Sequence, residues 1–273
     1  MTPYKYSNLV DELRDIRLLF LHPGQFEDDL RVTISHVSLT EPVSPPEKRL
    51  SLRELRATLP VGWHVFETVA GRYIFEHPES DLTTWVHPDP NVSACKQVGE
   101  APSITFLPRY EALSYTWGTT SNSSYLYVNS DDPKGPLSTL EIQQNLASAL
   151  KHLRLTQETR TLWVDAVCIN QKSIAERNTQ VTRMTSIYKY ACSVVAWLGP
   201  ESSDSKVALA ALDRIGSQTV LTKCVRRLRT PEAAHADWFQ SASTLPYPED
   251  TWHAILSVVN RSWFERVWIV QEI

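Results

Sequence analysis

The sequence lacks the signatures of several large protein classes. Its four cysteines, Cys95, Cys168, Cys192 and Cys224, form no CxxC pair and have no histidine at ligand spacing, which argues against a zinc site. No apolar run approaches the ~18 residues of a membrane span, and the N-terminus has no signal-peptide core. We therefore expect no membrane association, free thiols and a reducing, cytoplasmic location.

A basic surface and the common phosphate-binding motifs are also missing. The net charge is −4 and the isoelectric point is near 6.1, which disfavours nucleic acid as a partner. The chain has only eight glycines, and they form neither a GxGxxG fingerprint nor a P-loop. The residues alone therefore predict no required cofactor and no metal.

The chain does contain an alternation of strand and helix patterns. Its 273 residues, 42% of them hydrophobic, suffice for one sizeable domain and a smaller one. Apolar runs predict strands at 16–21, 31–39, 110–118, 123–129, 161–169 and 193–198. Helical spacing occurs at 138–154, 173–188, 205–215, 251–260 and 263–273, and 217–248 is loop-like. This order predicts an α/β fold with a doubly wound, largely parallel sheet, in which 161–169 and 193–198 are buried strands.

Four segments carry a family resemblance. YEALSYTWG (110–118), TLWVDAVCINQ (161–171), SVVAWLGP (193–200) and SWFERVWIVQEI (262–273) resemble the fungal heterokaryon-incompatibility (HET) domain. The resemblance implies an intracellular signalling module of non-self recognition that promotes programmed cell death. It also implies self-association, or a partner that is another HET- or NLR-type protein.

The same segments are similar to the boxes of Toll/interleukin-1-receptor (TIR) domains, some of which cleave the nicotinamide bond of NAD with a glutamate. That resemblance implies Glu272 as the catalytic residue, since a carboxylate stabilises an oxocarbenium-like sugar. Ligands of open α/β sheets bind beyond the carboxyl ends of the strands. The implied NAD-binding residues there are Ser114, Tyr115, Trp117, Gly118, Asp165, Asn170 and Trp268.

Structural roles for these residues remain open from the sequence. The tryptophans at 163, 197, 263 and 268 equally fit a hydrophobic core. Asp165 could cap a turn or pair with Arg183 or Arg266, because a carboxylate in an apolar run needs a partner. Glu272 could form an ion pair with Arg266. The pair Asn170–Gln171 also fits a turn ahead of a helix cap at Ser173, which opens a capping-box pattern with Glu176.

A smaller module precedes the HET-like region. Residues 59–90 resemble a WW domain, with Trp63, Trp85 and Pro88 at the family's spacing but one residue fewer before His77. The resemblance implies a three-stranded meander closed by Trp63 against Pro88 or Pro60. It also implies a groove for Pro-rich peptides, formed by Tyr73, Phe75, His77 and Trp85.

The expected organisation is a HET-type domain with an insertion. Residues 1–40 supply its first strands, 41–58 a Pro-containing linker and short helix, 59–90 the WW-like module and 104–273 the core. We expect the HET-type domain to continue beyond Ile273. One alternative function is a non-enzymatic adaptor that binds Pro-rich peptides and self-associates, and another is a short product with neither function.

Overall fold

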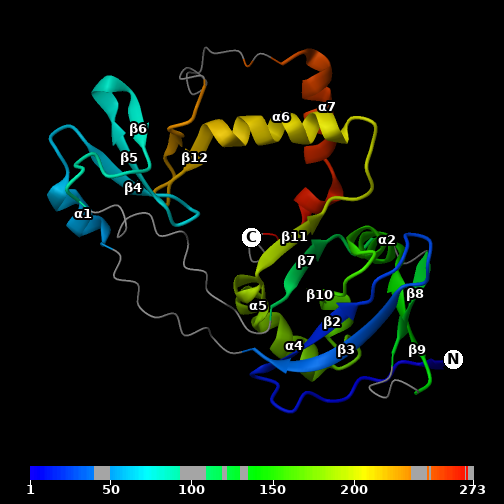
Figure 1. Cartoon of the computed structure of the whole chain (residues 1–273). Coiled ribbons are helices and arrows are strands. Elements are labelled where there is room, and N and C mark those ends of the chain that lie inside the picture. The colour runs from blue at the N-terminus through cyan, green and yellow to red at the C-terminus, as the bar shows by residue number, and fades with distance from the viewer. Residues whose placement is uncertain are drawn as a thin grey trace. The chain divides into compact units, whose positions relative to one another are not determined.

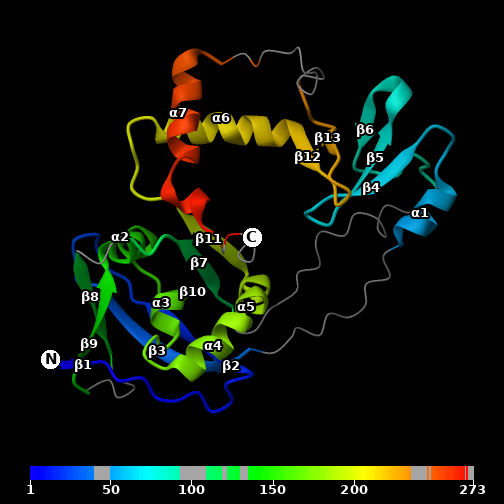
Figure 2. The ribbon, with the colours of Figure 1, turned by 180° about the vertical axis from the view of Figure 1, so that it is seen from behind.

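The chain forms two compact units, shown from opposite sides in Figures 1 and 2. The first comprises Met1–Pro42, Thr105–Glu201 and Val259–Ile273, and the second comprises Val43–Ile104 and Ser202–Val258. The structure is a computed structural model, and it describes residues 1–39, 50–92, 109–118, 122–129, 135–234, 245, 247–267 and 269. We describe each unit by itself.

A mixed sheet organises the first unit. Its described residues form eight strands in the order β1-β9-β8-β3-β2-β10-β7-β11. The strands are β1 (Thr2–Pro3), β2 (Asp15–Leu21), β3 (Arg31–Ser38), β7 (Glu111–Tyr115), β8 (Ser123–Val128), β9 (Ser138–Gln143), β10 (Arg160–Trp163) and β11 (Ser193–Trp197). The predicted strands at 16–21, 31–39 and 123–129 are thus confirmed, and the one predicted at 110–118 is confirmed over 111–115.

The sheet mixes parallel and antiparallel pairs, and β1 with β9 and β3 with β8 are parallel. Strands β10, β7 and β11 run parallel, whereas β2 pairs antiparallel with both β10 and β3, and β8 pairs antiparallel with β9. Strand β2 lies inside the sheet, and its residues Ile16, Leu18, Leu19 and Leu21 are fully buried. The expected α/β fold is therefore confirmed, but the sheet is mixed; its likeness to a TIR domain stays a prediction.

Short helices connect these strands. They are α2 (Gln144–Leu153), α3 (Asp165–Cys168), α4 (Ile174–Thr182), α5 (Met184–Tyr190) and the 3₁₀ turn η4 (Ser262–Glu265). Helix α2 buries Leu146, Ala147, Ala149 and Leu150, which recur at the three- and four-residue spacing of an amphipathic helix. Helix α4 begins, as predicted, after Ser173, whose hydroxyl accepts a hydrogen bond from the Glu176 amide.

Three sequence predictions were wrong in part. The first residues of 138–154 are not helical, because they pair with β8 as strand β9. The strand expected over 161–169 stops at Trp163, and a helical turn begins at Asp165. Strand β11 is at the edge of the sheet rather than buried, since it pairs only with β7 among the described residues, and Val194 is exposed.

The second unit joins two distant parts of the chain. It contains α1 (Leu52–Thr58), β4 (His64–Glu67), β5 (Tyr73–His77), the 3₁₀ turn η1 (Pro78–Ser80), β6 (Leu82–Thr84), α6 (Ser205–Gln218), β12 (Thr219–Leu221), β13 (Arg227–Arg229) and α7 (Glu249–Val259). Strands β4, β5 and β6 form the expected three-stranded antiparallel meander. Strands β12 and β13 form a hairpin in a region that the sequence predicted as a loop.

This hairpin is bound to the meander. The Val69 amide donates to the Leu221 carbonyl, and the Lys223 amide donates to the Glu67 carbonyl. Side-chain ion pairs join Lys223 to Glu67 and Arg226 to Glu76 across the same boundary. Residues 59–90 therefore share a compact unit with the segment from Ser202 to Val258, and their likeness to a WW domain stays a prediction.

Candidate functional site

The carboxyl ends of two parallel neighbouring strands meet in the first unit. Strands β7 and β10 pair in parallel, with Ala112 opposite Trp163, so the residues that follow them lie at the same edge. The indole Nε1 of Trp117 donates to Oδ2 of Asp165 at 2.8 Å. The structure therefore brings Trp117 and Asp165 together, as their positions after strands predicted, while their role in binding remains a prediction.

Asp165 begins α3 and is held there by local hydrogen bonds. Its Oδ1 accepts a hydrogen bond from the Ala166 amide at 2.7 Å, and its carbonyl accepts one from the Gln171 side chain at 2.8 Å. Arg183, a candidate partner from the sequence, instead donates to backbone carbonyls of residues 12, 14 and 15. The contacts with Ala166 and Gln171 thus hold Asp165 at the start of α3, and its Oδ2 accepts the hydrogen bond from Trp117.

Two predicted binding residues at this edge are buried. Tyr115 is almost fully buried, and burial, with the nearby Asp165 carboxylate as a second cause, raises the pKa of its hydroxyl well above the ordinary value. Ser114 is fully buried, and its Oγ accepts hydrogen bonds from Nε1 of Trp263 at 2.8 Å and from Nη1 of Arg266 at 2.9 Å. The cofactor-binding role expected of Ser114 therefore does not fit, because its hydroxyl anchors the segment around Trp263.

The core interpretation of the tryptophans is correct at two positions. Trp163 is fully buried, and Trp263 is nearly so. Trp197 is partly buried, and its Nε1 donates to Oδ1 of Asn145 at 3.0 Å. The Asn145 side chain in turn donates to the Thr116 carbonyl, so it supports the turn that follows β7.

Gly118 completes that turn. Its φ of +82° lies in the left-handed region, and a Cβ at this position would come within 3.5 Å of the Asn145 side chain. The glycine is therefore explained by backbone geometry. The role in binding NAD that the TIR resemblance implies for Gly118 stays a prediction.

A cavity of about 360 Å³ opens beside Trp117 and Asp165. One wall is apolar, and the polar groups include one carboxylate and two guanidinium groups, from Arg177 and Arg266. The Arg177 side chain is exposed and forms no hydrogen bond or ion pair with any described residue. We call this the arginine cavity; its lining residues are Thr116, Trp117, Asp165, Ile169, Gln171, Arg177, Val181, Met184 and Arg266.

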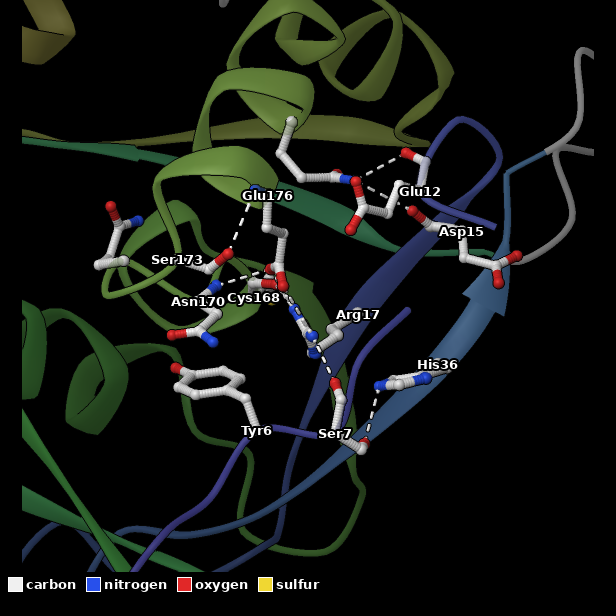
Figure 3. Close-up of polar contacts among 12 residues, drawn as sticks. Tyr6, Ser7, Glu12, Asp15, Arg17, His36, Cys168, Asn170, Ser173 and Glu176 are labelled. Carbon is white, nitrogen blue, oxygen red and sulfur yellow. Dashed lines mark hydrogen bonds and ion pairs between the residues drawn. The ribbon is translucent and has the colours of Figure 1, made fainter. Parts of the chain in front are cut away.

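A buried ion pair that the sequence did not predict holds the loop that carries Asn170 and Gln171. Figure 3 shows Arg17, from β2, pointing at Glu176, from α4. The pair is bidentate, with Arg17 Nη2 at 3.1 Å from Glu176 Oε2, and both side chains are buried. Glu176 Oε1 also accepts a hydrogen bond from the Asn170 amide at 2.7 Å. The pair thus fixes the loop that carries Asn170 and Gln171.

The sequence does contain one sign of this ion pair, a charged residue within an apolar strand. Arg17 interrupts the run IRLLFL, and a fully buried guanidinium requires an anionic partner. Its other hydrogen bonds run to the carbonyls of Cys168, at 3.2 Å, and Ser7, at 2.7 Å. Burial alone would raise the pKa of Glu176, but the hydrogen bonds from Arg17 and Asn170 outweigh it and hold that pKa below its usual range.

The residues of the expected peptide groove make other contacts in the meander. Tyr73 and Phe75 are buried in a core with Leu55 and Val65, and the Tyr73 hydroxyl donates to the Leu50 carbonyl. The Arg72 guanidinium covers the ring of Trp85 at 3.9 Å, and the Trp85 indole donates to Glu232.

His77, the remaining residue of the predicted groove, packs edge-on against Trp63 with ring centroids 5.3 Å apart. Its imidazole Nδ1 lies within hydrogen-bond distance of the Ser80 hydroxyl, at 2.9 Å. The four residues predicted to bind a peptide thus have structural partners, and α1, which the WW resemblance did not include, explains the burial of two of them.

Two predicted site residues lie outside the described part of the chain. These are Glu272, the expected catalytic residue, and Trp268. Among the described residues, no group of His, Cys, Asp and Glu side chains is arranged to hold a metal ion. None of the described helices has the length and hydropathy that crossing a membrane requires.

Comparison with known proteins identifies the family. Residues 110–272 match the family model described as heterokaryon incompatibility protein (HET). The chain is also 32% identical over 186 residues to heterokaryon incompatibility protein 6, OR allele, of Neurospora crassa, an alignment that covers 60% of this chain and 27% of that relative. The chain thus spans about a quarter of the length of that relative, and no solved structure matches it. Because the family model covers more than half of the chain and includes both strand ends of the arginine cavity, the chain belongs to the heterokaryon incompatibility (HET) family.

Proposed function

We propose that this chain is a cytoplasmic module of vegetative incompatibility that takes part in non-self recognition and promotes programmed cell death. Family membership and the name of the Neurospora relative support this role. Its partner is a second copy or another incompatibility protein, as the family resemblance implies. We further propose that the arginine cavity binds NAD.

The arrangement of charge and aromatic surface in this cavity supports NAD as the ligand. NAD carries a pyrophosphate anion and two planar rings. The Arg177 guanidinium is unpaired among the described residues and matches the geometry of phosphate oxygens. Trp117, with 46% of its surface exposed, offers an indole face for stacking, and Ile169, Val181 and Met184 supply apolar contact. The juxtaposition of Trp117, Asp165 and Arg177 is the observation that carries the proposal.

The proposed reaction is hydrolysis of the bond between nicotinamide and ribose. Nicotinamide leaves as a neutral base with the bonding electron pair, water adds to the ribosyl carbon, and the water proton passes to solvent. Glu272 stabilises the cationic ribosyl centre with its carboxylate. Arg266, which lines the cavity, precedes Glu272 by only six residues in the sequence, and this closeness along the chain supports the assignment.

Two measurements on the purified chain test this proposal: NAD binding by calorimetry and nicotinamide release by chromatography. We expect the wild-type chain to bind NAD, and Arg177→Gln to weaken binding roughly tenfold, which corresponds to about 1.4 kcal/mol. Arg53→Gln, which removes an exposed arginine of α1, is the matched control and is expected to bind as wild type. Glu272→Ala is expected to bind NAD without releasing nicotinamide.

The outcomes separate the two parts of the proposal. A folded chain that does not bind NAD at millimolar concentration refutes the role of the arginine cavity. Binding without nicotinamide release by the wild-type chain refutes cleavage and leaves NAD as a ligand. The adaptor function is not proposed, because Tyr73 and Phe75 are core residues.

A further inference from the structure

A second cavity adjoins the arginine cavity at Trp117. It has a volume of about 560 Å³, and the two cavities share Trp117 and Gln171. Its wall is unusually aromatic, with contributions from the N-terminal segment, β7, β8 and the residues after β7. We call it the tyrosine cavity, after four of its lining residues, Tyr4, Tyr6, Tyr115 and Tyr125.

The N-terminal segment is held over this cavity by specific contacts. Strand β1 pairs in parallel with β9, and the Tyr4 amide donates to the Thr139 carbonyl at 2.8 Å. The Tyr6 hydroxyl donates to the Val167 carbonyl at 2.9 Å, and its ring lies 5.0 Å from the Arg17 guanidinium (Figure 3). The Tyr4 and Tyr6 rings meet edge to face at 5.0 Å. The aromatic wall is therefore built before any ligand arrives.

The tyrosine cavity offers what a heteroaromatic base requires. Trp117 and Tyr125 are 46% and 51% exposed, so both residues offer aromatic surface for stacking. Amide side chains of Asn170 and Gln171 and the Lys172 side chain lie in the same lining and can hydrogen-bond to ring nitrogens. Both cavities lie within the volume range of about 300–1,000 Å³ that small-molecule sites occupy.

We propose that the tyrosine cavity is the adenine subsite of a dinucleotide that crosses Trp117. This inference rests on the proposed function, because it takes NAD as the ligand of the neighbouring cavity. The orientation follows from the proposed function, which places the nicotinamide end at the arginine cavity, where Arg266 and Arg177 lie. The adenine ring then stacks against Tyr125 and Trp117, while the pyrophosphate lies toward Arg177.

Calorimetric titration with NAD and with each of its two mononucleotide halves tests this assignment. Wild-type chain and a Tyr125→Ala variant are titrated with NAD, AMP and nicotinamide mononucleotide. Because stacking of one base on an aromatic side chain is worth about 1–3 kcal/mol, we expect Tyr125→Ala to weaken NAD and AMP roughly tenfold or more. Nicotinamide mononucleotide is expected to bind the variant and the wild type equally.

The control is Tyr127→Ala. It removes the same side chain two positions along β8, outside the lining of the tyrosine cavity, and is expected to leave all three affinities unchanged. NAD binding that Tyr125→Ala does not weaken overturns the adenine subsite while the proposed function stands. Equal weakening of AMP and nicotinamide mononucleotide also overturns it, since a general loss of structure would act on both. A wild-type chain that binds none of the three ligands overturns the subsite together with the proposed function.

Discussion

At the scale of single residues, the Arg17–Glu176 pair connects segments that are far apart in the sequence. Arg17 reaches the carbonyls of Ser7 and Cys168, and Glu176 holds the Asn170 amide (Figure 3). Loss of one partner of such a buried pair leaves a charge without compensation. The pair therefore stabilises the N-terminal segment, the end of α3 and the start of α4 together, and all three border the two cavities.

We expect Glu176→Gln to lower the free energy of unfolding by roughly 3 kcal/mol at neutral pH, because the buried Arg17 guanidinium loses its counter-charge. Glu158→Gln, at an exposed site, is the control and should change stability by less than about 0.5 kcal/mol. Chemical denaturation of the two variants measures the difference. Equal, small effects would show that the pair contributes little.

The pKa of Glu176 predicts how that difference depends on pH. Although its burial acts in the other direction, the hydrogen bonds from Arg17 and Asn170 lower this pKa in the folded chain. The stabilisation is therefore complete above the pKa of the unfolded chain and is lost as the pH falls through the lower, folded value. Denaturation between pH 7 and pH 3 should show the wild-type advantage over Glu176→Gln shrinking at the acid end. An advantage that is constant over this range would contradict the assignment.

The cysteines should differ sharply in reactivity. Burial raises the pKa of the Cys168 thiol to about 12, whereas a hydrogen bond with Thr222 lowers that of the exposed Cys224. Since the thiolate is the reactive form, maleimide at pH 7.5 should label Cys224 first and leave Cys168 unlabelled until the chain unfolds. Peptide mass spectrometry after timed labelling gives the order. Rapid labelling of Cys168 in the folded chain would contradict its burial.

At the scale of elements, one sequence pattern leads to two different structures. Ser51–Glu54 and Ser173–Glu176 both have the serine-x-x-glutamate spacing of a capping box. At α1 the box is complete, with Glu54 accepting a hydrogen bond from the Ser51 amide at 2.7 Å. At α4 only the serine half forms, because Glu176 turns inward to Arg17.

We therefore expect Glu54→Gln to have only a local effect. Glutamine can still accept the hydrogen bond from the Ser51 amide, so the cost should stay below about 1 kcal/mol. Hydrogen exchange of the α1 amides should accelerate slightly, while exchange in the first unit is unchanged. A loss of stability as large as that expected for Glu176→Gln would show that Glu54 and Glu176 contribute equally to stability, and would contradict this difference between the two boxes.

At the scale of the whole molecule, the meander depends on residues beyond 59–90. Its core includes Leu55 of α1, and the β12–β13 hairpin supplies backbone hydrogen bonds and the ion pairs Lys223–Glu67 and Arg226–Glu76. A peptide of residues 59–90 should therefore be unfolded, because three short strands alone bury too little apolar surface. Circular dichroism and amide proton dispersion measure this directly. Folding of the isolated peptide would instead support an autonomous WW-like module.

The sequence by itself determined the α/β class, most strand positions, the three-stranded meander and the placement of Trp117 and Asp165 after neighbouring strands. These depend on local hydrophobic patterns and turn residues, which can be read along the chain. Only the tertiary structure decided that 138–143 pairs with β8, that Ser114 is an anchor, and that Tyr73 and Phe75 are core residues. It also decided that Glu176 pairs with Arg17, 159 residues away. Each of these outcomes depends on which distant segment covers a side chain, and local spacing along a chain carries no information about that partner.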